Sequence, residues 1–141
     1  MSTAMTREGG CLCGEVRYRV TGPLRDIIGC HCSQCRRTTG HYLPATATRL
    51  RHFERLEDRG LKWFRASDDA SRGFCGSCGA TLFWQLDGGD SISIIAGSLD
   101  DASGLTLAAH IFTANKGAYY ELDPDVPAFA AGSGGTVPTP E

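Results

Sequence analysis

Seven cysteines in three short clusters are the residues of this sequence best suited to chemistry. The clusters are Cys11-Leu12-Cys13, Cys30-His31-Cys32-Ser33-Gln34-Cys35 and Cys75-Gly76-Ser77-Cys78. No apolar segment of the kind that directs secretion precedes them, so we expect a cytoplasmic, reducing location in which disulfides do not persist. Because thiolates are good zinc ligands, the predicted role of these cysteines is metal binding.

The third cluster has the form of a zinc-ribbon knuckle. Cys75 and Cys78 are separated by two residues and Gly79 follows them, which favours a tight loop whose backbone amides point at the sulfurs. A structural zinc needs four ligands, and one knuckle supplies two of them. Cys11 and Cys13 are the obvious second pair.

Cys30, Cys32 and Cys35 then remain. Three protein ligands with one open position are typical of a catalytic zinc rather than a structural one. The sequence therefore predicts two Zn²⁺ per chain, one in a closed structural site and one in an open catalytic site. His31 lies between two of the ligands, and we expect its side chain to point away from the metal and to be packed or hydrogen-bonded.

Two other arrangements of the cysteines also fit the spacing. Cys75 and Cys78 could form a redox dithiol, although no βαβ pattern surrounds them. Alternatively, the cysteines of residues 30–35 could share one zinc with this pair, which would leave Cys11 and Cys13 spare.

Short strands separated by turn residues are predicted to position these clusters. Val16, Tyr18 and Val20 alternate with arginines, a pattern typical of a strand with one apolar face. Further strands are predicted at residues 42–47, 61–65, 81–86, 91–95 and 105–113, with a hairpin connection at residues 87–90. A single helical turn is predicted over residues 33–38. The expected fold class is all-β (mainly β), with little helix.

Length and composition exclude several classes of protein. The chain has 141 residues, of which 41% are hydrophobic and 21% charged, as in one soluble globular domain rather than a disordered or fibrous chain. No uncharged stretch is long and apolar enough to span a bilayer, so we expect no membrane partner.

The charge of the chain argues against binding to nucleic acid. The formal net charge is -2, and seven thiolates with two Zn²⁺ would lower it to about -5. Arginine carries nearly all of the basic charge, and Lys62 and Lys116 are the two lysines. This favours contacts of planar guanidinium groups with anions over a diffuse cationic surface. We therefore expect no nucleic-acid partner.

The three clusters resemble the glutathione-dependent formaldehyde-activating (GFA) family, which also includes the centromere protein V domain. The matching segments are Gly10-Cys11-Leu12-Cys13-Gly14-Glu15-Val16-Arg17-Tyr18, Cys30-His31-Cys32-Ser33-Gln34-Cys35-Arg36-Arg37 and Phe74-Cys75-Gly76-Ser77-Cys78-Gly79-Ala80-Thr81-Leu82. The resemblance covers residues 9–129, the expected zinc-binding domain. Residues 1–8 are an expected N-terminal extension, and residues 130–141 an expected flexible tail with too few apolar residues to order itself.

The resemblance implies a fold, a metal arrangement and an activity. The fold is a β-tent, made of short antiparallel sheets pinned by zinc. The metals divide as above, with Cys11, Cys13, Cys75 and Cys78 on the structural zinc and Cys30, Cys32 and Cys35 on the catalytic one. The activity is that of an S-(hydroxymethyl)glutathione synthase, a carbon-sulfur lyase that joins a small aldehyde such as formaldehyde to glutathione or another thiol.

Four cationic side chains are candidates for substrate contact. Arg36 and Arg37 follow the second cluster directly, and a guanidinium group there could act in catalysis and receive a substrate carboxylate. Lys116 and His110 are candidates by weaker similarity to the family. All four could instead be solvated or packed residues, and Trp84 could line the pocket or fill the core.

A non-catalytic alternative is a binding module in which both metals merely replace a core that short strands cannot build. It predicts that a fourth protein ligand, such as His31, closes the second site. The enzyme hypothesis predicts instead that the metal of the second site has an exchangeable ligand at its fourth position.

Overall fold

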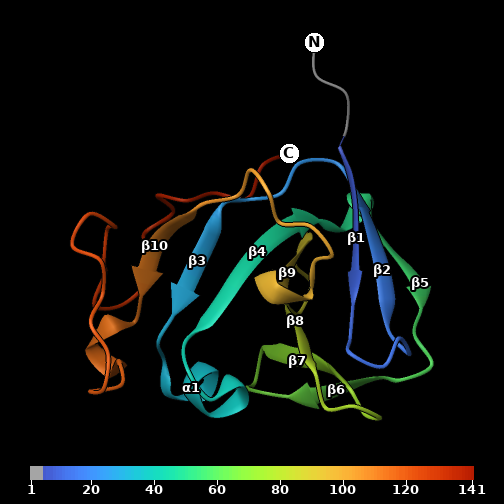
Figure 1. Ribbon diagram of the computed structural model, residues 1–141, viewed down its shortest axis with the longest axis horizontal. Helices are drawn as coiled ribbons and strands as arrows, with labels where there is room; N and C mark the ends of the chain where they lie inside the picture. Colours follow the sequence, from blue (N-terminus) through green and yellow to red (C-terminus); the bar gives the residue numbers. More distant parts are fainter. Residues whose placement is uncertain (1–4) are drawn as a thin grey trace.

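The computed structural model describes residues 5–141 and divides their strands between two sheets. The smaller sheet is antiparallel and stands at one side of the molecule (Figure 1), in the order β1 (Thr6–Gly10), β2 (Arg17–Thr21) and β5 (Phe53–Glu57). The larger sheet has the order β10 (Leu107–Ile111), β3 (Ile27–Cys30), β4 (Leu43–Arg49), β9 (Ser91–Ile95), β8 (Thr81–Leu86), β7 (Ala70–Cys75) and β6 (Leu61–Arg65).

Helical structure in the described part of the chain is short. The α-helix is α1 (Ser33–Thr39), and the 3-10 turns are η1 (Leu50–His52), η2 (Ala96–Ser98) and η3 (Thr113–Asn115). The predicted all-β fold class and the helical turn after the second cysteine cluster are thus confirmed. None of the described helices is long and apolar enough to cross a membrane.

The strands predicted from alternation and turn residues are present as β2, β4, β6, β8, β9 and β10. Sequence reasoning missed the other four strands, β1, β3, β5 and β7. Glycine interrupts three of them, including β1 with its sequence TREGG and β7 with ASRGFC. Sheet pairing overrides their weak strand propensity, which a local pattern cannot show.

One strand pair differs from the expectation of purely antiparallel sheets. β10 pairs with β3 in parallel, with His110 opposite Gly29 and Ile111 opposite Cys30. Residues 96–106 carry the chain from β9 to the far edge of the sheet (Figure 1), which is the kind of long connection that a parallel pairing needs. This edge strand lies directly beside the second cysteine cluster.

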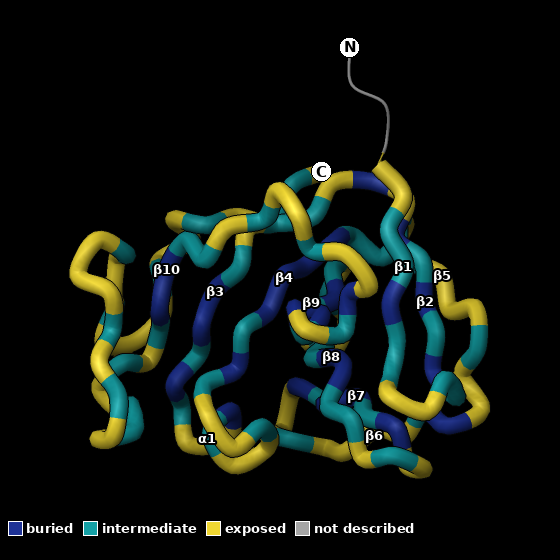
Figure 2. Tube along the Cα trace, in the orientation of Figure 1, coloured by how far each residue is buried: buried dark blue, intermediate teal, exposed yellow. Residues whose placement is uncertain are grey.

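The main core lies between the two sheets. Tyr18 of β2 is fully buried, stacks on Phe53 at a ring distance of 5.6 Å and meets the edge of Phe83 at 5.4 Å. Buried residues recur along the central strands β4, β8 and β9 (Figure 2). The alternation of Val16, Tyr18 and Val20 does mark an apolar face, because all three belong to this core.

Gly9 allows the two sheets to approach closely. Gly9 is opposite Tyr18 in the β1–β2 pair, and it also forms an isolated β-bridge with Leu99, the residue that follows η2. A Cβ atom at Gly9 would lie 2.4 Å from both the Tyr18 hydroxyl oxygen and the Ser98 carbonyl oxygen. Any side chain here would therefore push β1 away from the core.

The two ends of the described chain both contact the sheets. Residues 6–8, within the expected N-terminal extension, are part of β1, while residues 1–4 lie outside the described residues. In the expected tail, the Ala131 carbonyl accepts a hydrogen bond from the Phe112 amide at 2.8 Å, and the Thr139 carbonyl accepts one from Arg49 at 2.9 Å. Residues at both ends thus make hydrogen bonds with the sheets or the residues next to them, while the domain limits and the flexibility of residues 130–141 stay predictions.

Candidate metal centres and the adjoining pocket

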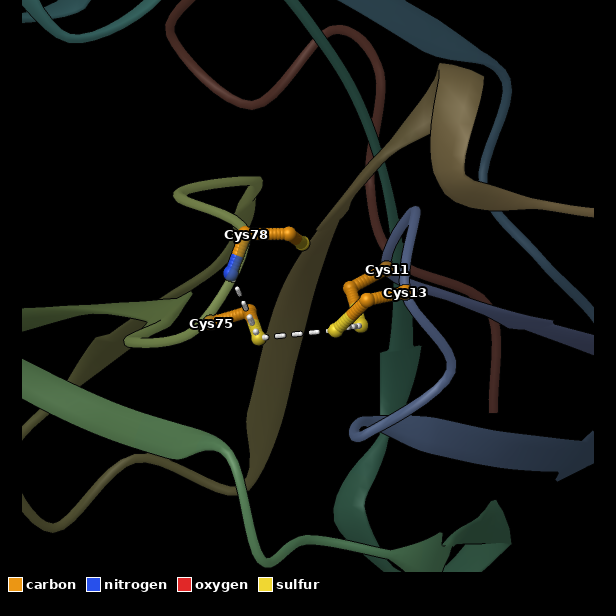
Figure 3. A group of neighbouring side chains, drawn as sticks. All are labelled: Cys11, Cys13, Cys75 and Cys78. Carbon is orange, nitrogen blue, oxygen red and sulfur yellow. Dashed lines mark hydrogen bonds between the residues drawn. The ribbon is translucent and has the colours of Figure 1, made fainter.

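The first metal-binding candidate joins the β1–β2 loop to the β7–β8 loop. The ligand atoms of Cys11, Cys13, Cys75 and Cys78 all lie within 4.8 Å of one another, and the four side chains converge from the two loops (Figure 3). Sulfur-to-sulfur distances are 3.7 Å for both Cys11–Cys13 and Cys13–Cys75. All four cysteines are free thiols.

Local backbone geometry explains why both loops present their sulfurs. Gly14 and Gly79 follow the two cysteine pairs with φ values of +88° and +80°, a region that favours glycine. The turns direct amides at the sulfurs: Val16 donates to the Cys11 sulfur at 3.2 Å, and backbone hydrogen bonds, the largest from Ala80, lower the pKa of Cys78 to about 6. In each loop, backbone amides thus favour the thiolate of one cysteine, Cys11 in the first and Cys78 in the second.

The second candidate lies where β3 runs into α1. Cys30 ends β3, Cys32 caps the helix by accepting a hydrogen bond from the Cys35 amide at 3.3 Å, and Cys35 is buried in the first turn. Their three sulfurs lie within 4.8 Å of one another. The hydrogen bond from Cys30, together with contributions from Cys32 and the Arg72 guanidinium, lowers the pKa of Cys35 to about 6.

The donor sets of both clusters fit zinc. A tetrahedral ion with Zn–S bonds of about 2.3 Å requires ligand sulfurs roughly 3.8 Å apart, close to the 3.7 Å separations in the first cluster. The two clusters form separate groups, so the arrangement with one shared zinc is not what the structure shows. Among residues 5–141 no fourth Cys, His, Asp or Glu joins Cys30, Cys32 and Cys35.

A cavity of about 400 Å³ adjoins the three-cysteine cluster. All three cysteines line it, and the rest of its wall is largely apolar, with Ile28, Leu43, Ala45, Trp84, Ile111 and Phe112. A small substrate in this cavity would therefore lie beside the sulfurs and against a mainly apolar wall.

The four cationic residues expected at this pocket do not line it. Arg37 is exposed on α1, and the half-buried Arg36 has its Nε atom buried without a hydrogen-bond partner. The Lys116 ammonium donates to the carbonyls of Gly117 and Tyr120. Sequence proximity to the cysteines was the reason to select Arg36 and Arg37, but a helical turn directs neighbouring side chains to different faces.

Arg25 and Arg72 line the cavity instead. Arg72 comes from β7 and is 7% exposed; its Nη2 donates to the Cys35 sulfur at 3.6 Å and to the Gln34 side-chain oxygen at 3.1 Å. Arg25 precedes β3 and donates from Nη2 to the Ala45 carbonyl at 2.9 Å. No motif marked either residue, because only the pairing of the strands brings them to the cysteines.

His31 and His110 lie in a separate buried group and are hydrogen-bonded to each other. The His31 side chain is fully buried: its Nδ1 lies 2.5 Å from the Tyr120 hydroxyl and its Nε2 lies 2.8 Å from Nδ1 of His110. Burial lowers the pKa of His31 to about 4, which keeps the ring neutral. With both nitrogens engaged, His31 is not placed as a fourth ligand, in accord with the expectation that it packs away from the metal.

Comparison with known proteins bears directly on these two centres. The sequence profile of the family described as "Glutathione-dependent formaldehyde-activating enzyme" matches residues 6–115, a span that contains all seven cysteines. The chain belongs to the GFA family. The GFA match begins with β1 and ends with η3, so both sheets and both cysteine clusters of this GFA chain fall within it.

A solved structure also resembles this GFA chain. It is the crystal structure of a Rhodobacter sphaeroides protein, with 25% sequence identity and a TM-score of 0.57, and the alignment covers 69% of this chain and 91% of that one. A search of curated protein sequences found no match. The profile match over residues 6–115 establishes the family.

Proposed function

We propose that the chain is a zinc-dependent enzyme of the carbon-sulfur lyase type that reversibly joins a thiol, glutathione or another, to a small aldehyde such as formaldehyde. The observation that carries the proposal is the three-cysteine cluster at the wall of an apolar cavity, with no fourth ligand among the described residues. The membership of the chain in the GFA family supports the same chemistry. The seven free thiols suit a reducing compartment, and we propose the cytoplasm.

Each cluster has its own part in this proposal. Cys11, Cys13, Cys75 and Cys78 hold a structural zinc, and Cys30, Cys32 and Cys35 hold a catalytic one. When bound by three thiolates, zinc supplies an open coordination position that lowers the pKa of a thiol or polarises a carbonyl oxygen.

The reaction requires no oxidant or reductant. A carbon-sulfur bond forms between the thiol sulfur and the aldehyde carbon, the carbonyl π bond opens, and the thiol proton passes to the carbonyl oxygen. The cavity wall places mainly apolar side chains around the reacting atoms. The Arg72 guanidinium, 3.6 Å from the Cys35 sulfur, stabilises negative charge on the cluster during thiol exchange.

The test combines metal content with turnover. Protein purified without added metal is assayed for zinc per chain, and the exchange of ¹³C-formaldehyde with glutathione is followed by NMR against the spontaneous rate. We expect two zinc ions per chain and an exchange rate above background that Cys32→Ser removes. Two zinc ions with no acceleration for any thiol and aldehyde pair would instead support the zinc-stabilised binding module.

A further inference from the structure

Three exposed residues mark where the cavity beside the three-cysteine cluster opens to solvent. Among the residues that line this cavity, Gln34, Ser67 and Phe112 are exposed, whereas others such as Cys35 and Arg72 are buried. Phe112 is 36% exposed and is the one large apolar side chain of the three. A molecule that enters the cavity from solvent therefore meets an aromatic ring at its mouth.

The backbone of Phe112 has a conformation that its side chain disfavours. Its φ and ψ angles are 55° and 39°, and no other non-glycine residue among residues 5–141 has a positive φ. In this left-handed region the Cβ atom comes close to a backbone carbonyl oxygen, which costs free energy for a bulky residue. Such a conformation persists only where the surroundings hold it, and it concentrates at functional sites.

Part of the C-terminal segment holds Phe112 in this conformation. The Phe112 amide donates to the Ala131 carbonyl at 2.8 Å. The amide and the hydroxyl of Thr113 both donate to the Phe129 carbonyl at 3.1 Å. On the other side, the Phe129 amide donates to the His110 carbonyl at 2.8 Å. Hydrogen bonds before, at and after Phe112 thus fix its backbone to one segment.

Phe112 also lies close to the metal ligands along the sheet. Ile111, the residue before it, is opposite Cys30 in the β10–β3 pair, and both of these residues line the cavity. The segment that holds Phe112, residues 129–131, lies beyond the span of residues 6–115 that matches the GFA profile. The mouth of the cavity is therefore shaped by a part of the chain that the family match does not include.

We propose that Phe112 is a specificity-determining residue, which limits the size of the molecules that reach Cys30, Cys32 and Cys35, and that residues 129–131 hold it in place. Because its backbone is fixed, the ring can yield to a bulky molecule only by rotating about its own side-chain bonds. The role of the cluster as the reacting site rests on the proposed function, whereas the size limit concerns only access to the three sulfurs.

The experiment compares two neutral thiol reagents that differ in size alone. Zinc-loaded, full-length protein reacts with substoichiometric N-methylmaleimide or N-cyclohexylmaleimide, and mass spectrometry of peptides gives the rate at each cysteine. Cys13, an exposed thiol of the other cluster, is the internal reference. Relative to Cys13, we expect the larger reagent to react at least about tenfold more slowly than the smaller one at Cys30, Cys32 and Cys35.

Two substitutions of the ring and one control test the role of Phe112. Phe112→Ala removes the ring, and we expect it to reduce the discrimination between the reagents to about twofold or less. Phe112→Tyr keeps the ring and should keep the discrimination. Leu56→Ala is the matched control, because Leu56 is 39% exposed, belongs to β5 in the smaller sheet and does not line the cavity. It should also keep the discrimination.

Phe129→Ala tests whether the C-terminal segment holds Phe112. It removes the large apolar side chain of that segment, and the discrimination should fall at least about threefold. Unchanged discrimination in a folded Phe129→Ala protein would show that this segment does not position the ring.

Two results would overturn the size limit itself. One is equal access of both reagents to the three cysteines of the unsubstituted protein, a comparison that depends on no variant folding. The other is a Phe112→Ala protein, folded by circular dichroism, in which neither rate at these cysteines changes.

Failure of the proposed function has a different signature. If Phe112→Ala admits the larger reagent while no thiol and aldehyde pair turns over, the size limit stands and the enzyme proposal falls. If a thiol and aldehyde pair turns over while both reagents reach the cluster equally well, the enzyme proposal stands and the size limit falls.

Discussion

At the scale of single residues, Cys32 has two separable roles. Its sulfur belongs to the three-cysteine cluster and also caps α1 by accepting a hydrogen bond from the Cys35 amide. Serine is a good helix cap and a poor zinc ligand. Cys32→Ser should therefore keep the fold while zinc falls from two ions to one per chain and turnover falls at least about 100-fold. Thermal unfolding and elemental analysis check this.

Cys78→Ser should behave differently because Cys78 belongs to the cluster that joins two distant loops. We expect a loss of at least about 4 kcal/mol in the free energy of unfolding, which is of the order of the whole stability of a small domain. The measurement is chemical denaturation alongside the Cys32→Ser protein. Equal destabilisation by both substitutions would contradict the division into structural and catalytic centres.

Tyr18 makes stability depend on alkaline pH. Burial raises the pKa of Tyr18 to about 12, from an ordinary value of 10.0. Between these values the unfolded chain loses the proton and the folded chain keeps it, so stability is full below pH 10 and falls as the pH rises. Tyr18→Phe should cost about 1 kcal/mol near neutral pH, since the hydrogen bond to Ser98 is lost.

Between pH 9 and pH 11 the free energy of unfolding of Tyr18→Phe should also fall by about 1 kcal/mol less than that of the unsubstituted protein. Urea unfolding of both proteins at these two pH values measures the difference. The same decline in both proteins would show that ionisation of Tyr18 does not contribute.

At the scale of elements, the segment that follows η3 supports the turn between β3 and α1. Tyr120 and His110 engage the two nitrogens of His31, at 2.5 and 2.8 Å, and His31 connects two cysteines of the second cluster. A ring held at both nitrogens fixes the backbone on either side of it. Tyr120→Phe frees one nitrogen, and we expect the zinc affinity of the second cluster to fall about tenfold, as when an outer hydrogen bond to a metal site is removed.

Tyr119→Phe is the matched control for this prediction. Tyr119 is 70% exposed, and its hydroxyl contacts His41 at 2.6 Å rather than His31. Competition titrations with a zinc chelator should separate the two variants. An equal loss of affinity in both would mean that the whole segment, and not the contact with His31, supports the cluster.

At the scale of the whole molecule, the two clusters connect very different lengths of chain. The first joins residues 62 positions apart, Cys13 and Cys75, and so ties the smaller sheet to the larger one. The second lies within residues 30–35 and connects only β3 with α1. A cross-link over a long loop restricts the unfolded chain more than a short one does.

Gradual chelation should consequently release zinc in two steps. The ion of the three-cysteine cluster should leave first, with the far-ultraviolet circular dichroism unchanged. The ion of the four-cysteine cluster should leave later, together with the strand signal. Zinc release and circular dichroism recorded on the same sample test the order. Release of both ions in one step, with loss of structure, would show that the second centre also holds the fold.

The sequence alone favoured a grouping of the cysteines into four and three, with one zinc shared between residues 30–35 and the knuckle left open as an alternative. The spacing of the knuckle, the pair at residues 11 and 13 and the three thiols within residues 30–35 are local properties, and the structure groups the sulfurs in the same way. The alternation in β2 and β9 was equally readable, because one buried face imposes a period of two. Local rules fix the spacing within each cluster and the strand period, whereas the choice between the two arrangements of the clusters required the structure.

Only the tertiary structure decided what surrounds the second cluster. Arg25 and Arg72 lie in segments far apart in the sequence, and nothing near either residue predicts that both line one cavity. The parallel pairing of β10 likewise places Ile111 beside Cys30 and His110 beside His31. Side chains meet across a sheet according to strand order and register, which arise from the packing of the whole chain and not from any local pattern.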